Sequence, residues 1–196
     1  MPEHISLYLA AFITSCVAIA FLYPLSVRVG LVDIPRGRKQ HQGAVPLIGG
    51  IATYCGLSLA LLLFADSSIE PIYYLLCSGT IVLLGVFDDY LDLSVKLRLA
   101  IQTLVGLAMT YSLNLHLGSL GDLFGMGVVE LGVLGIPVTL IAVIAAINAF
   151  NMTDGIDGLA GMLSIVSFVT IAIFMSLWGQ QLHAAMALVV VLAMLP

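Results

Sequence analysis

Two amides and two carboxylates are spaced three residues apart where an apolar segment should be leaving a membrane: Asn148, Asn151, Asp154 and Asp157. Polar groups are costly in hydrocarbon, so their presence there indicates function. Each step of three turns an ideal helix by about 300°, so the four side chains cannot share one narrow helical face. Interleaved glycines favour a turn that lets them converge on one ligand. The alternative is an Asn/Asp-rich turn in which Asp157 caps the next helix.

A second cluster follows the third apolar run and contains Asp88, Asp89, Asp92, Lys96 and Arg98. Two carboxylates about 5 Å apart repel by roughly 3 kcal/mol at an effective dielectric of 20, and a divalent cation removes that repulsion. Oxygen ligands suit Mg²⁺ or Mn²⁺, so the first two aspartates are candidate metal ligands. A solvated aspartate pair is the alternative. The side chains of Lys96 and Arg98 could bind a phosphate group or anchor the next helix at the lipid headgroups.

A third cluster is the loop between Gly30 and Gly50, which contains Arg36, Arg38, Lys39 and His41. Cationic side chains in a loop punctuated by glycine and proline suit phosphate groups. The same residues could serve only as the positive flank that orients a membrane protein. Both interpretations stay open, with Lys39 and His41 as candidate substrate contacts.

Long apolar helices must position these clusters. The chain is 61% hydrophobic and 9% charged, whereas soluble domains carry about 25% charged residues. The apolar runs are continuous and not alternating, which predicts an all-α, polytopic transmembrane bundle. A seventh run begins near residue 182 and is too short for a full span, so we expect one integral membrane domain, 1–196, that is the N-terminal part of a longer protein. The six complete spans are predicted at 6–27, 47–65, 71–87, 97–114, 136–150 and 159–178.

The positions of the cations predict the orientation of the chain. All six Lys and Arg residues lie after the first and third runs, which puts both segments in the cytoplasm and the N-terminus outside. Counting onward, the Asn/Asp segment is also cytoplasmic, so the three clusters share one membrane face. The 116–135 loop contains no Lys or Arg, as expected of an outside loop, and is Gly-rich enough to form a short hairpin.

Several classes of protein receive no support. The three cysteines lie in apolar runs and do not suggest disulfides. There is no GxxxxGK[ST] loop, zinc-ligand spacing or GxSxG turn, and six dispersed cations do not indicate nucleic-acid binding. Side chains suited to bind a metal ion, phosphate groups and a polar head group are expected on one face of the membrane. This combination predicts metal-assisted phosphoryl transfer to a lipid. A transporter with an intramembrane ion path is the rival class, but its polar residues should lie near span midpoints.

Three motifs resemble the polyprenyl-phosphate N-acetylhexosamine-1-phosphate transferases: GLVDIPRGRKQHQGAVPLIGG at 30–50, DDYLDLSVKLR at 88–98 and NAFNMTDGIDGLAG at 148–161. The third is closer to bacterial undecaprenyl-phosphate GlcNAc-1-phosphate transferases than to phospho-MurNAc-pentapeptide translocases. The resemblance implies transfer of GlcNAc-1-phosphate from a UDP-sugar to undecaprenyl phosphate at the cytoplasmic face of the plasma (inner) membrane. This releases UMP and starts a cell-envelope polysaccharide such as lipopolysaccharide or teichoic acid. A translocase-type or other UDP-HexNAc transferase is the alternative.

The resemblance also implies roles for the clustered residues. The family has about ten or eleven spans, a later metal-binding aspartate and a His-rich loop, so an inactive scaffold is a further alternative for this part of the chain. The mechanism stays open between a one-step attack and a two-step route through an aspartate. A homodimer is also possible. The implied roles are the Mg²⁺ and catalytic pair for Asp88 and Asp89 and proton removal for Asp92. Nucleotide-sugar contacts are implied for Asn148, Asn151, Asp154 and Asp157, with Asp154 and Asp157 also as catalytic candidates. Weaker phosphate contacts are implied for Lys39, His41, Lys96 and Arg98.

Overall fold

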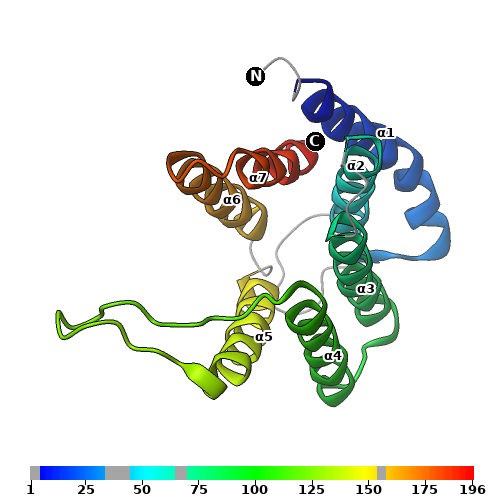
Figure 1. The fold of residues 1–196 in the computed structure, drawn as a ribbon. Helices are drawn as coiled ribbons and strands as arrows, with labels where there is room; N and C mark the ends of the chain where they lie inside the picture. Colours follow the sequence, from blue (N-terminus) through cyan, green and yellow to red (C-terminus); the bar gives the residue numbers. More distant parts are fainter. Residues whose placement is uncertain (1–4, 34–44, 65–69, 154–157) are drawn as a thin grey trace.

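The computed structural model describes residues 5–33, 45–64, 70–153 and 158–196. Within these ranges the chain is helical apart from short strands, a 3-10 turn and connecting loops (Figure 1). The helices are α1 (Ile5–Val29), α2 (Gly49–Phe64), α3 (Glu70–Leu91), α4 (Val95–Leu113), α5 (Gly135–Thr153), α6 (Leu159–Leu177) and α7 (Gln181–Met194), with η2 at Gly132–Leu134.

Helix length and composition confirm the predicted all-α bundle of membrane helices. Two further apolar helices, α2 and α7, are shorter, at 16 and 14 residues. Helix α4 is the least apolar of the seven described helices, because Lys96, Arg98 and Gln102 lie in its first half. Four of the six predicted spans are described as helices with the length and composition of a full membrane span: Ile5–Val29, Pro71–Leu91, Gly132–Thr153 and Leu159–Leu177.

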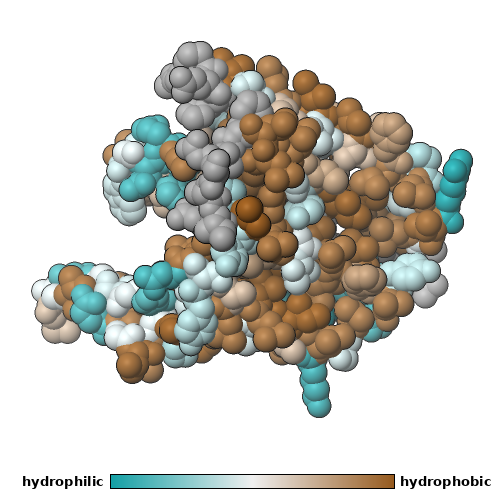
Figure 2. Space-filling model, turned by 45° about the vertical axis from the view of Figure 1, so that its right-hand side comes forward, coloured by the Kyte–Doolittle hydropathy of each residue, from teal (hydrophilic) through white to brown (hydrophobic). Residues whose placement is uncertain are grey.

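The outside of the bundle is apolar. Large side chains such as Phe21, Leu62, Ile141 and Leu177 are each at least two-thirds exposed. Figure 2 shows hydrophobic residues over most of the visible surface of the helices. A water-soluble protein rarely exposes apolar patches of this extent, whereas a lipid-facing surface requires them.

Helices α1, α2 and α7 pack together through small residues. A Cβ atom added to Gly56 of α2 would lie 2.6 Å from the carbonyl oxygen of Ala11 on α1. The Ser15 hydroxyl donates a 2.6 Å hydrogen bond to the carbonyl oxygen of Ala193 on α7. Small side chains allow close backbone approach where lipid removes the usual hydrophobic drive between helices. The buried cluster on these helices comprises Leu7, Ala11, Ala60, Val189 and Ala193.

Helix α4 packs between α3 and α5 and contacts both (Figure 1). Its residues Gln102, Gly106 and Thr110 are buried and recur every four residues, so they lie on one face of the helix. A Cβ atom at Gly106 would lie 2.8 Å from Leu140 Cδ2 of α5. This face of small and polar residues lets α4 approach α5 closely.

The loop after α1 begins and ends in a small antiparallel ladder. Gly30 ends α1 with φ +77°, and the Leu31 N–H donates to the Ser26 carbonyl at 2.9 Å, an arrangement that satisfies a terminal helix carbonyl. Strands β1 (Val32–Asp33) and β2 (Val45–Pro46) then pair. The ladder brings together the two ends of the basic motif, whose residues 34–44 lie outside the described ranges.

The Gly-rich 116–135 loop forms the hairpin that its composition predicts. Ser119 bridges Glu130 in antiparallel fashion, and the Leu120 N–H donates to the Val129 carbonyl at 2.9 Å. In Figure 1 the hairpin extends away from the helices.

Candidate active site

An ion pair joins α3 to α4 at one end of these helices. Arg98 Nη1 lies 2.5 Å from Asp88 Oδ2 and donates a hydrogen bond to it. The side chains are 26% and 15% exposed, respectively, so the pair is largely shielded from solvent. The two residues of the DDYLDLSVKLR motif that sequence reasoning assigned to metal and phosphate therefore contact each other.

The second oxygen of Asp88 has no such partner. Oδ1 is buried and accepts no hydrogen bond from any described residue. A buried carboxylate oxygen without a donor is costly, and a cation is one way to satisfy it. Asp89 follows on the same helical turn and is exposed. These carboxylate oxygens fit the predicted magnesium ion, for which oxygen ligands are preferred.

The turn between α3 and α4 differs from the predicted one in its boundaries. Helix α3 continues past the aspartate pair to Leu91, and Asp92 ends it with φ +50°, its N–H donating to the Asp88 carbonyl at 2.8 Å. Ser94 caps α4, accepting from the Leu97 N–H at 3.4 Å. Asp tolerates the left-handed region because its short side chain bonds locally. Lys96, predicted in the loop, is instead an exposed residue of the first turn of α4.

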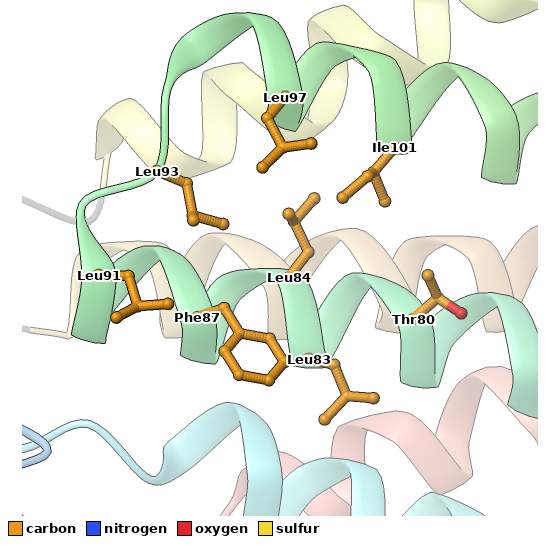
Figure 3. Close-up of a pocket in the computed structure, with 8 residues that line it drawn as sticks. All are labelled: Thr80, Leu83, Leu84, Phe87, Leu91, Leu93, Leu97 and Ile101. Carbon is orange, nitrogen blue, oxygen red and sulfur yellow. The ribbon is translucent and has the colours of Figure 1, made fainter.

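An apolar pocket of about 320 Å³ opens between α3 and α4. Phe87, which lines it, precedes Asp88 directly. In Figure 3 the labelled side chains come from both helices and from the turn, and the Thr80 hydroxyl is their one heteroatom. The lining residues are Thr80, Leu83, Leu84, Phe87, Leu91, Leu93, Leu97 and Ile101.

A second polar contact joins α4 to α5. The Asn148 Nδ2 group donates to Gln102 Oε1 at 2.9 Å and to the Ile144 carbonyl at 2.8 Å. Gln102 is 5% exposed and lies one helical turn after Arg98. Helix α4 thus contacts the aspartate motif through one residue and the Asn/Asp motif through the residue one turn later.

The described residues on either side of the Asn/Asp segment end one helix and begin the next. Helix α5 ends at Thr153, α6 begins at Leu159, and Gly158 has φ +75°. Asn151 is exposed on the last turns of α5. Asp154 and Asp157, together with Lys39 and His41 of the basic loop, lie outside the described residues, so their assigned roles stay predictions.

Gln102 is the site residue that sequence reasoning missed. It stands in the apolar 97–114 segment, where a buried amide is expensive and indicates a specific partner. The sequence contains that signal but does not show which residue is the partner. Among the described residues, no three His, Cys, Asp or Glu side chains converge closely enough to hold a metal, so the two adjacent aspartates are the described candidates.

Comparison with known proteins gives consistent matches. The model of glycosyl transferase family 4 matches residues 71–196. The undecaprenyl-phosphate alpha-N-acetylglucosaminyl 1-phosphate transferase of Yersinia pestis is 44% identical over 126 residues, 63% of this chain and 34% of that protein. Its counterpart in Escherichia coli O157:H7 is 43% identical over 132 residues, 67% of this chain and 36% of that protein. The chain therefore spans about a third of the length of the curated relatives it matches.

Proposed function

The chain belongs to glycosyl transferase family 4, and from this membership we propose that the protein transfers GlcNAc-1-phosphate from UDP-GlcNAc to undecaprenyl phosphate and releases UMP. The lipid acceptor and the sugar come from the names of the relatives. The nucleotide donor is what the family resemblance implies, and UMP would be the leaving group that this transfer requires. The lipid-linked product would start a cell-envelope polysaccharide.

The observation that carries this proposal is the pair of contacts that α4 makes. Arg98 reaches the aspartate motif on α3, and Gln102 reaches the first residue of the Asn/Asp motif on α5. Four residues along a helix correspond to a rise of about 6 Å. The two α4 residues that contact these motifs are therefore one helical turn apart, although the motifs are separated by sixty residues in the chain, and this supports a common site for a single nucleotide sugar.

The proposed reaction is a direct displacement at phosphorus. An oxygen of the lipid phosphate attacks the β-phosphorus of UDP-GlcNAc, and the bond from that phosphorus to the bridging oxygen breaks to release UMP. Both reactants are anionic, so catalysis depends on orientation and charge neutralisation. Asp92, exposed at the α3–α4 turn, is proposed to take a proton from the lipid phosphate. Asn151, Asp154 and Asp157 are proposed to contact the nucleotide sugar.

Asp88 and Asp89 are the residues proposed to hold Mg²⁺. When bound, the ion would supply positive charge against the diphosphate. Arg98 contributes independently of the ion: it donates a hydrogen bond to Asp88 and fixes the direction of its carboxylate. Lys96, Lys39 and His41 are proposed as outer contacts for phosphate oxygens.

The apolar pocket between α3 and α4 supports a lipid as one substrate. Its lining is almost entirely hydrocarbon, and one lining residue, Phe87, is the neighbour of Asp88 in the chain. An isoprenoid tail lying there would bring its phosphate toward the aspartates. We propose that the reaction takes place at the cytoplasmic face, where nucleotide sugars are available and where the positive-inside rule puts these motifs.

Release of UMP from UDP-GlcNAc by membranes that carry the protein tests the proposal. We expect release that requires both undecaprenyl phosphate and Mg²⁺, with EDTA abolishing it and added Mg²⁺ restoring it. The control omits the lipid. UMP release without the lipid, or release only from UDP-MurNAc-pentapeptide, would contradict the assignment. Solute flux across vesicles without any UMP would favour a transporter.

A further inference from the structure

We infer that Gln102 is a positioning residue that commits Asn148 to binding the nucleotide sugar as a hydrogen-bond acceptor. The inference rests on the proposed function and specifies what one residue of that site recognises. Its consequence is that Asn148 contacts an N–H or O–H group of the ligand and not a phosphate oxygen.

The orientation of the Asn148 amide follows from its neighbours. The Ile144 carbonyl, 2.8 Å away, is a backbone oxygen that can only accept, so the Asn148 atom facing it must be the nitrogen. An amide nitrogen carries two protons. The other points to Gln102, whose facing atom must then be its carbonyl oxygen, at 2.9 Å. The assignment of oxygen and nitrogen in both side chains is therefore fixed by geometry.

Both donor protons of Asn148 are thus used inside the protein. Its Oδ1 atom makes no hydrogen bond to any residue in the described part of the chain. An incoming ligand therefore meets an acceptor. Phosphate oxygens are also acceptors and cannot bond to it, whereas the uracil N–H, the acetamido N–H and the sugar hydroxyls can.

The surroundings of Gln102 suit a positioning role. The side chain is 5% exposed and lies on the face of α4 that also carries Gly106 and Thr110. Burial restricts its rotamers, and a buried hydrogen bond between two side-chain amides is stronger than an exposed one. Gln102 does not itself need to touch the ligand, because it acts through the direction that it imposes on Asn148.

Steady-state kinetics with UDP-GlcNAc as the varied substrate test the inference in membranes that carry the protein. Gln102→Met keeps the length of the side chain but lacks the carbonyl oxygen. We expect its KM for UDP-GlcNAc to rise about five- to tenfold, the loss of one hydrogen bond, with the KM for undecaprenyl phosphate unchanged. Gln102→Glu keeps an acceptor oxygen and should restore most of the affinity.

Two further variants separate positioning from a general structural effect. Thr110→Val removes a buried hydroxyl that bonds only within α4, to the Gly106 carbonyl, and should leave both KM values as they are. The double variant Gln102→Met/Asn148→Leu should have a KM for UDP-GlcNAc no higher than that of Asn148→Leu alone. If Gln102→Met will not accumulate in membranes, Gln102→Leu takes its place.

The possible results are distinct. An equal rise in the KM for UDP-GlcNAc in Gln102→Met and Gln102→Glu would overturn the inference while the transferase activity stands. So would a double variant whose KM rises by the product of the two single effects. An unchanged KM in Gln102→Met would do the same. A wild-type protein that transfers no sugar phosphate at all would instead refute the proposed function.

Discussion

Asp88 and Arg98 are joined by a 2.5 Å ion pair between the last turn of α3 and the first turn of α4. Each charge lies at the helix end where the macrodipole disfavours it, the carboxylate near a C-terminus and the guanidinium near an N-terminus. Their contact offsets both penalties. The stability of the α3–α4 hairpin should therefore depend on the pair and not on either charge alone.

Arg98→Gln should destabilise the protein by about 1–3 kcal/mol, the usual range for a hydrogen bond to a charged group, because Asp88 is left shielded and unpaired. Thermal unfolding in detergent measures the loss. Lys96→Gln is the matched control, since Lys96 is an exposed cation two residues away, and should change stability by less than about 0.5 kcal/mol. Adding Asp88→Asn to Arg98→Gln should recover part of the loss; a further additive loss would argue against coupling.

The aspartate pair should be essential for turnover. Asp88→Asn or Asp89→Asn is expected to lower sugar-phosphate transfer by orders of magnitude, because each removes charge from the proposed metal site, while the protein still inserts into membranes. Initial rates normalised to membrane-inserted protein give the measurement. Asp122→Asn serves as control, because Asp122 lies in the hairpin and accepts from the Gly127 N–H. Near-normal rates in the first two variants would refute the metal assignment.

Packing of α2 against α1 should depend on Gly56. Gly56→Ala would place a methyl group 2.6 Å from a backbone oxygen of α1, which cannot move aside as a flexible side chain can. We expect a loss of about 1–3 kcal/mol in the free energy of unfolding. Gly85→Ala in α3 is the comparison, since nothing lies within 4 Å of its added Cβ. That variant should be neutral or more stable by up to about 1 kcal/mol; equal effects of both substitutions would contradict the packing account.

The predicted orientation in the membrane can be tested with two equally exposed methionines. Met126 in the hairpin and Met152 at the end of α5 are both 85% exposed. In a background without the native cysteines, a membrane-impermeant maleimide should label Met126→Cys in intact cells and Met152→Cys only after the membrane is opened. The reverse pattern would place the Asn/Asp motif outside and exclude a cytoplasmic donor.

The sequence determined the helices of this protein. Each predicted apolar run is a helix whose described ends lie within four residues of those expected, and Gly158, with φ +75°, directly precedes α6. Backbone groups in hydrocarbon must bond within their own segment, so the length of an apolar run sets a helix almost by itself. The ends of α4 were predicted equally well, although Lys96 and Arg98 make this helix less apolar than a full membrane span.

Which residues of those helices meet depends on how the helices pack together. The spacing of Asp88, Arg98, Gln102 and Asn148 along the chain predicts neither the ion pair nor the amide contact, because both depend on how each helix is rotated and which helices are neighbours. Those choices follow from close approach at small residues such as Gly56 and Gly106. Packing forces act between segments far apart in the chain, and no local pattern of residues records them.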